Sequence, residues 1–222
     1  MRLRNTYPDT VFRRRQTVKQ KQALQYAYCN NNPVNNVDLR GDSVTILNLE
    51  DWTNQHVAML IQNEEGKWQY YSVNGDNVYS SGKHTGGREF DDIAVGEWDS
   101  PQQFMDSHYN TEGDKENKDI DKYGFPEGYV IPTTSEQDNT IRTKFTDISE
   151  NEEYRLNPLN PNQCATTVQR SLNKAGIETG VTNVSYRWGE RFESKVNPYL
   201  PSQAYKAIIY NNPNGFKVYK TK

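Results

Sequence analysis

Three apolar segments separated by short polar stretches constrain the fold of this chain more than any other feature. The segment Val57–Ile61 is apolar at every position, which is typical of a strand buried on both faces. The polar residues 63–67 predict a hairpin turn that leads into 68–73, a segment rich in strand-forming residues. Residues 44–47 form an earlier apolar run of the same kind. We therefore predict a central antiparallel sheet built around these segments.

Helical signals follow the strands. Ser100 precedes Pro101, and this pair predicts the N-cap and first residue of a short helix. Further along, Thr134 or Ser135 is expected to cap a second helix. Three apolar residues lie on one face of this second helix, namely Ile141, Phe145 and Ile148. Strands and helices in one chain predict the α+β class.

The remaining segments are assigned from local composition. Residues 74–99 are polar and contain several glycines, which predicts a long loop. Residues 129–131, 204–210 and 216–220 have the composition of short strands. The stretch from 178 to Tyr199 is rich in aromatic residues, and we expect it to be irregular.

Charge is distributed unevenly along the chain. Residues 1–22 carry seven basic side chains and one acid, Asp9, although the whole chain has a net charge of −3. Such an arm is either a solvated leader or a contact for an acidic partner. The rest of the chain has no basic stripe interleaved with aromatic residues, so we do not expect nucleic acid as a partner. The length of 222 residues fits this basic arm followed by a single domain, 23–222.

Several classes of protein are not expected. The sequence lacks an apolar run of about 18 residues, so we predict no membrane-spanning helix. The basic N-terminus has no apolar signal segment after it, which leaves the cytoplasm or export without a cleaved signal. Cys29 and Cys164 are far apart, and the histidines lack metal-ligand spacing. We therefore expect no disulfide framework, no metal and no cofactor.

The clearest candidate for chemistry is Cys164. Apolar residues recur with helical spacing over 165–175, and Gly176 follows as a C′ residue. With Asn162 as the N-cap, Cys164 falls in the first turn, where unpaired backbone N–H groups stabilise a thiolate. Gln163 is either a donor to an oxyanion or an exposed residue at the start of the helix. The alternative is that Cys164 is a small buried hydrophobic residue.

His56 is the candidate general base. It opens the buried strand 57–61, and an imidazole titrates near neutral pH, so it can take the proton of a thiol. The next strand carries Ser72 and Asn74, which share a face because they are two residues apart. Position favours Ser72 as the residue that orients the imidazole, whereas chemistry favours Asn74, whose amide oxygen accepts a hydrogen bond. Together with Cys164 these residues predict a triad, although His56 alone also fits a structural histidine.

The order of these segments resembles a known superfamily. Gly41-Asp42, the segment 56–61, the segment 71–75 and the segment 162–165 follow one another as in circularly permuted NlpC-type papain-like enzymes. In that superfamily the permuted members carry the histidine strand before the cysteine helix. A similar order occurs in domains at the ends of Rhs-type bacterial polymorphic toxins. The resemblance covers about residues 38–177.

Two positions depart from the superfamily pattern. Gln163 stands between Asn162 and Cys164, where we expect asparagine directly before the cysteine. The third catalytic residue of the superfamily is usually histidine, asparagine or an acid, whereas this chain offers Ser72 or Asn74.

The resemblance implies a papain-like catalytic domain and a cysteine amidase or peptidase that acts through a thioester on Cys164. It further implies peptide or cell-wall substrates, and an antibacterial effector with an immunity protein or a secretion machinery as partner. Two other classes stay open. One is a catalytically inactive papain-like binding module, and the other is a deamidase or acyltransferase that acts on protein or lipid.

Overall fold

The computed structural model describes residues 42–50, 55–74, 91–110, 124–156, 162–188 and 190–221, all within one compact unit, Gly41–Lys222. The predicted basic arm and its boundary at residue 22 lie outside the described residues, as do Cys29 and Gly41.

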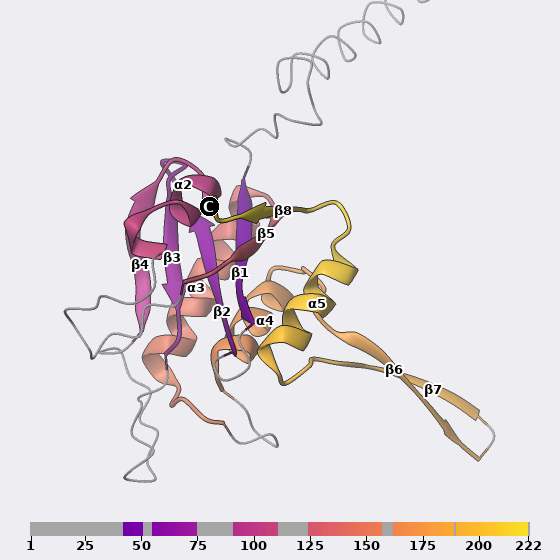
Figure 1. Ribbon diagram of the computed structural model, residues 1–222. Helices are drawn as coiled ribbons and strands as arrows, with labels where there is room; N and C mark the ends of the chain where they lie inside the picture. Colours follow the sequence, from indigo (N-terminus) through magenta and orange to yellow (C-terminus); the bar gives the residue numbers. More distant parts are fainter. Residues whose placement is uncertain are drawn as a thin grey trace, which may run out of the picture. The chain divides into compact units, whose positions relative to one another are not determined.

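Four strands open the described part of the chain, and helices and strands follow in mixed order (Figure 1). In chain order the elements are β1 Ser43–Glu50, β2 Gln55–Gln62, β3 Trp68–Ser72, β4 Asp92–Trp98, α2 Pro101–Met105, the 3-10 helix η2 His108–Asn110, β5 Glu127–Pro132, α3 Ser135–Asn151, α4 Cys164–Lys174, β6 Val181–Arg187, β7 Glu190–Val196, α5 Pro201–Asn211 and β8 Phe216–Tyr219.

Six strands form one sheet in the order β4-β3-β2-β1-β5-β8, and every neighbouring pair is antiparallel. The register pairs Leu49 of β1 with His56 of β2, and Met59 of β2 with Tyr71 of β3. The α+β class and the central antiparallel sheet are therefore confirmed. β2 lies in the interior of the sheet, between β1 and β3.

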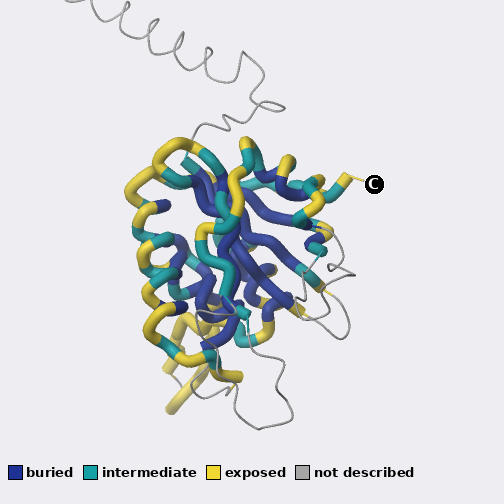
Figure 2. The backbone as a smooth tube through the Cα atoms, turned by 90° about the vertical axis from the view of Figure 1, so that its left-hand side faces the viewer, coloured by how far each residue is buried: buried dark blue, intermediate teal, exposed yellow. Residues whose placement is uncertain are grey.

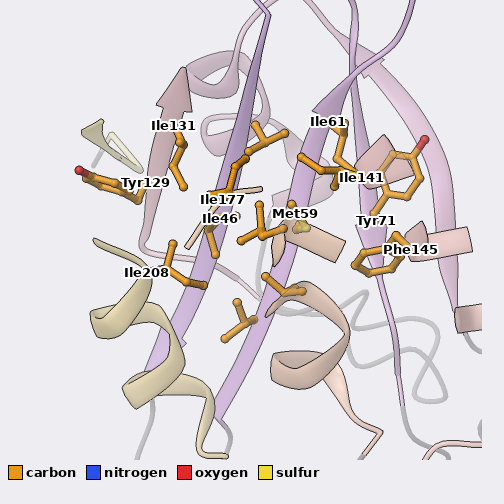
Figure 3. Close-up of a cluster of buried hydrophobic side chains, with 14 of the residues drawn as sticks. Ile46, Met59, Ile61, Tyr71, Tyr129, Ile131, Ile141, Phe145, Ile177 and Ile208 are labelled. Carbon is orange, nitrogen blue, oxygen red and sulfur yellow. The ribbon is translucent and has the colours of Figure 1, made fainter. Parts of the chain in front are cut away.

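Helices α3, α4 and α5 cover one face of the sheet. Side chains from these helices share one hydrophobic cluster with alternate residues of β1, β2, β3 and β5, including Met59 of β2 (Figure 3). Phe145 of α3, Leu172 of α4 and Ile208 of α5 are each completely buried there. Figure 2 shows that the strands of the sheet are mostly buried, whereas the helices that cover the sheet have exposed residues on their outward sides. Burying each large apolar side chain contributes about 1.5–3 kcal/mol, so this cluster fixes α4 against the sheet.

A second cluster fills the opposite face. It contains Leu60 of β2, Trp68 and Tyr70 of β3, Phe104 of α2 and Phe125. Phe104 stacks on Tyr70, with ring centroids 5.5 Å apart. The two clusters explain the continuous apolar run in β2, because neighbouring residues enter opposite layers.

The predicted helix starts are confirmed. Ser100 caps α2 and accepts a hydrogen bond from the N–H of Gln103, with Pro101 as the first helical residue. Thr134 rather than Ser135 caps α3, and its side chain accepts from the N–H of Gln137. Within the described residues, the helices are too short or too polar to cross a membrane.

Three assignments from composition are wrong. Residues 204–210 belong to helix α5, where Ala204, Ala207 and Ile208 face the core with helical spacing, although isoleucine and tyrosine favour strands. The polar segment 74–99 contains β4, which pairs with β3 despite its glycine and its irregular register. The aromatic stretch before Tyr199 forms the regular hairpin β6–β7.

Candidate active site

Helix α4 begins at Cys164 itself. Its N-cap is Gln163, whose N–H donates to Oγ1 of Thr166, so the predicted cap Asn162 lies one residue outside the helix. Asn162 instead pairs with Arg155 through two backbone hydrogen bonds. Cys164 is therefore the first helical residue, and its own N–H has no partner within the helix.

The other end of α4 has the predicted glycine. Gly176 has a φ of 79°, a left-handed conformation that a residue with a Cβ adopts only with strain. The N–H of Ile177 bonds to the carbonyl of Leu172, and both side chains enter the cluster beneath the helix. This closure fixes the rotation of α4 and therefore the direction in which Cys164 points.

The thiol of Cys164 is surrounded by polar groups of the side chain of Gln163 and of the backbone. It donates to Oε1 of Gln163 over 3.4 Å, and Nε2 of Gln163 donates to the carbonyl of Tyr199 over 2.6 Å. The backbone N–H groups of Val57, Ala165 and Cys164 lie near the sulfur and lower the pKa of the thiol. Gln163 therefore holds the thiol in this structure, and one of its amide hydrogens is occupied by Tyr199.

His56 is held from the neighbouring strand. Its Nε2 lies 2.7 Å from Oγ of Ser72, and that hydroxyl donates to Oδ1 of Asn74 over 2.9 Å. A hydroxyl has one hydrogen, so Ser72 accepts from Nε2–H of the imidazole. The network thus assigns the neutral tautomer in which Nδ1 carries no proton. Ser72 is the direct partner of His56, and Asn74 acts behind it.

The hydrogen-bond chain continues beyond Asn74 to a carboxylate. Nδ2 of Asn74 donates to Asp92 over 3.2 Å, and the hydroxyl of Tyr109 donates to the other oxygen of Asp92 over 3.3 Å. Burial, together with the charge of Asp92, raises the pKa of Tyr109, so this phenol stays a donor. Asp92 fixes which way the Asn74 amide is turned. Composition gave no signal for Asp92, because β4 was not predicted.

The Cys164 sulfur and the His56 imidazole lie on different sides of strand β2. Both are next to the peptide group that joins His56 to Val57. Val57 packs in the cluster beneath α4, as does Val168, which lies one helical turn after Cys164. Alternation along β2 directs His56 to the opposite face, where its ring centroid lies 6.0 Å from that of Phe125. The Val57 N–H, which lies close to the sulfur, points along the plane of the sheet. The sulfur thus lies near the backbone next to His56, but the thiol does not approach the imidazole over one shared face.

Burial keeps both groups neutral. Desolvation raises the pKa of the Cys164 thiol to about 11, despite the N–H groups of Val57, Ala165 and Cys164 that favour the thiolate. Desolvation lowers the pKa of His56 to about 3. Cys164 is 2% exposed and His56 is 4% exposed. The resting pair is therefore a thiol and a neutral imidazole at pH 7, not a thiolate and an imidazolium.

A cleft elsewhere on the protein does not lead to this site. It has a volume of about 810 Å³, and β3, β4 and α3 line it with residues such as Tyr71, Glu97 and Arg142. None of the candidate site residues lines this cleft. In the described ranges, no group of three or more histidine, cysteine and acidic residues could hold a metal ion.

The chain matches no protein-family model, no curated protein and no solved structure.

Proposed function

We propose that the protein is a cysteine amidase or peptidase in which Cys164 is the nucleophile and His56 is the general base. The observation that carries this proposal is that the sulfur of Cys164 lies near the N–H of Val57, in the peptide group that follows His56. The tautomer imposed by Ser72 supports it, because the unprotonated Nδ1 is the nitrogen that can accept a proton.

The proposed reaction requires the thiol to leave Gln163, and it requires the two side chains, which approach β2 from different faces, to move toward each other. The sulfur attacks the carbonyl carbon of an amide while its proton passes to Nδ1 of His56. The first N–H groups of α4, from Cys164 and Ala165, stabilise the oxyanion. The amine departs with the proton from His56, and water then hydrolyses the thioester with His56 again as base.

The substrate class follows from the resemblance described above. NlpC-type enzymes cleave amide bonds of cell-wall peptides, and we propose such a peptide as the substrate. The resemblance to toxin-associated domains extends the proposal to an antibacterial effector that has an immunity protein or a secretion machinery as partner. A deamidase or an acyltransferase would use the same cysteine and histidine on a different acyl donor.

The experiment is digestion of purified cell-wall peptides, with the products identified by mass spectrometry. The wild type is expected to release one new amine and one new carboxylate per cleaved bond, and Cys164→Ala is expected to release neither. Ser171→Ala is the matched control, because Ser171 is a small buried residue of α4 whose hydroxyl donates to the carbonyl of Thr167 in the same helix. Cleavage that persists in Cys164→Ala would contradict the proposal.

A second candidate function is a catalytically inactive binding domain. The burial of Cys164 and His56, the neutral state of both groups and their approach from different faces of β2 favour it. Such a domain predicts that Cys164→Ala keeps the full biological effect of the wild type. A catalytic domain predicts that this variant loses the effect while keeping the fold.

A further inference from the structure

Hairpin β6–β7 is exposed along its whole length and extends away from the six-stranded sheet (Figure 1). Its exposed residues include six large apolar side chains, those of Val181, Val184, Tyr186, Trp188, Phe192 and Val196. Trp188, in the two-residue connection between the strands, is 96% exposed. Such a concentration of exposed apolar residues is typical of an interaction surface.

The hairpin also has two open edges. β6 and β7 form a two-stranded sheet, and among the described residues no further strand pairs with either of them. A two-stranded ribbon is only marginally stable in water, and a third or fourth strand stabilises it. Exposed edges pair readily with strands of other chains unless charges or bulges prevent it. The two edges of this hairpin differ in this respect.

The sequence of β6 is compatible with antiparallel pairing to a copy of itself. An axis through Val184 places Val184 opposite Val184 of the partner subunit and Thr182 opposite Tyr186 of the partner subunit. The same register sets Asn183 opposite Ser185 of the partner subunit. The one charged residue of β6, Arg187, then lies opposite Val181 of the partner subunit, so no like charges meet.

The sequence of β7 opposes the same arrangement. A full-length antiparallel pair of β7 strands places Glu193 opposite Glu193 of the partner subunit. It also places Arg191 opposite Lys195 of the partner subunit. Like charges directly opposite one another destabilise a strand pair. The distribution of charge therefore favours self-pairing through the edge of β6, where no like charges meet, over self-pairing through the edge of β7.

We propose that two copies of the protein associate through the outer edges of β6 and form a four-stranded sheet in the order β7-β6-β6-β7. The two-fold axis passes through Val184, so the interface uses the same residues on both subunits and closes as a dimer. The dimer is independent of the chemistry proposed for Cys164.

The test compares two cysteine variants in a Cys29→Ser background of the full chain. Val184 and Glu193 are cross-strand partners, so both variants place a thiol at the same level of the hairpin. Directly opposite residues have Cβ atoms about 4.5–5.5 Å apart, which approaches the geometry of a disulfide. Under mild oxidation, Val184→Cys is expected to give a covalent dimer on a non-reducing gel, and Glu193→Cys is expected to stay monomeric.

Sedimentation without cross-linking supplies the second measurement. The wild type is expected to show a concentration-dependent species of twice the 25.7 kDa subunit mass. Val184→Lys sets two positive charges against each other at the axis and is expected to abolish this species, whereas Glu193→Lys is expected to retain it. A wild type that stays monomeric up to millimolar concentration overturns the proposal. So does cross-linking of Glu193→Cys that is as fast as that of Val184→Cys.

Discussion

Oγ of Ser72 lies 2.7 Å from Nε2 of His56, and this contact determines which imidazole nitrogen carries the proton. The hydroxyl of Ser72 is turned toward Oδ1 of Asn74, so it can only accept from the imidazole. Nδ1 is consequently the basic nitrogen. The proposed role of His56 therefore depends on a residue that would not itself touch substrate.

Ser72→Ala is expected to destabilise the protein and to disturb the tautomer of His56. The variant leaves a buried imidazole N–H without its acceptor, which costs about 1–3 kcal/mol. Urea unfolding measures the loss, and the ¹⁵N shifts of the His56 ring report the tautomer. Unchanged ring shifts in Ser72→Ala would contradict the assignment.

Asp92→Leu is expected to change the His56 ring shifts with the overall fold retained. Asp92 accepts from Nδ2 of Asn74, and without this bond the amide is no longer held with Oδ1 toward Ser72. Tyr109→Phe is the control, because it removes the hydrogen bond from Tyr109 to Asp92 and leaves the bond to Asn74. Ring shifts that move equally in both variants would indicate a purely structural role for Asp92.

The pH dependence of stability provides a test of the buried imidazole. The pKa of His56 is lowered from 6.5 to about 3 in the folded protein. Between these values the unfolded chain binds a proton that the folded protein does not bind. The free energy of unfolding therefore loses up to about 1.4 kcal/mol per pH unit from this group as the pH falls from 6.5 toward 3.

Other groups titrate in the same window, so the comparison with His56→Gln is the informative one. Burial raises the pKa of Asp138 to about 6, which adds stability as the pH falls and opposes the effect of His56. The wild type is expected to lose more stability than His56→Gln between pH 6.5 and 4 in urea unfolding. Parallel curves for the two proteins would show that His56 is not buried.

Leu172→Ala is expected to destabilise the protein by about 2–5 kcal/mol, because it opens a cavity between α4 and the sheet. Lys174→Ala, two residues further along the same helix at an exposed position, is expected to stay within about 0.5 kcal/mol of the wild type. Thermal unfolding measures both. A similar small loss in both variants would contradict the packing of α4 described here.

Part of the fold was predictable from local patterns. The apolar run Val57–Ile61 predicts a strand, and the turn residues after it predict that the chain returns as a neighbouring strand. Both signals lie within a short stretch of sequence. Residues 204–210 mislead because isoleucine and tyrosine favour strands, whereas Pro201 and the burial of Ala204 and Ile208 fit a helix only once the core is known. β4 is set by pairing with β3, which local composition does not encode.

The sequence indicated most residues of the candidate site and their local positions, but it did not indicate Asp92 or the contacts between distant segments. The first-turn position of Cys164 and the pairing of His56 with Ser72 follow from short-range rules for helix ends and strands. The contact of Gln163 with Tyr199 and the contact of Asn74 with Asp92 join segments far apart in the sequence. The approach to β2 from different faces depends on which side α4 packs, and only tertiary packing decides that.

The most direct test of the proposed chemistry is the rate at which p-nitrophenyl acetate acylates Cys164. We expect the wild type to release p-nitrophenolate with one equivalent of acetyl thioester on Cys164. His56→Gln is expected to be about 10²–10⁴-fold slower, which is the usual contribution of a general base. Equal rates in the wild type and His56→Gln, or acylation that is unchanged in Cys164→Ala, would contradict the catalytic role of this pair.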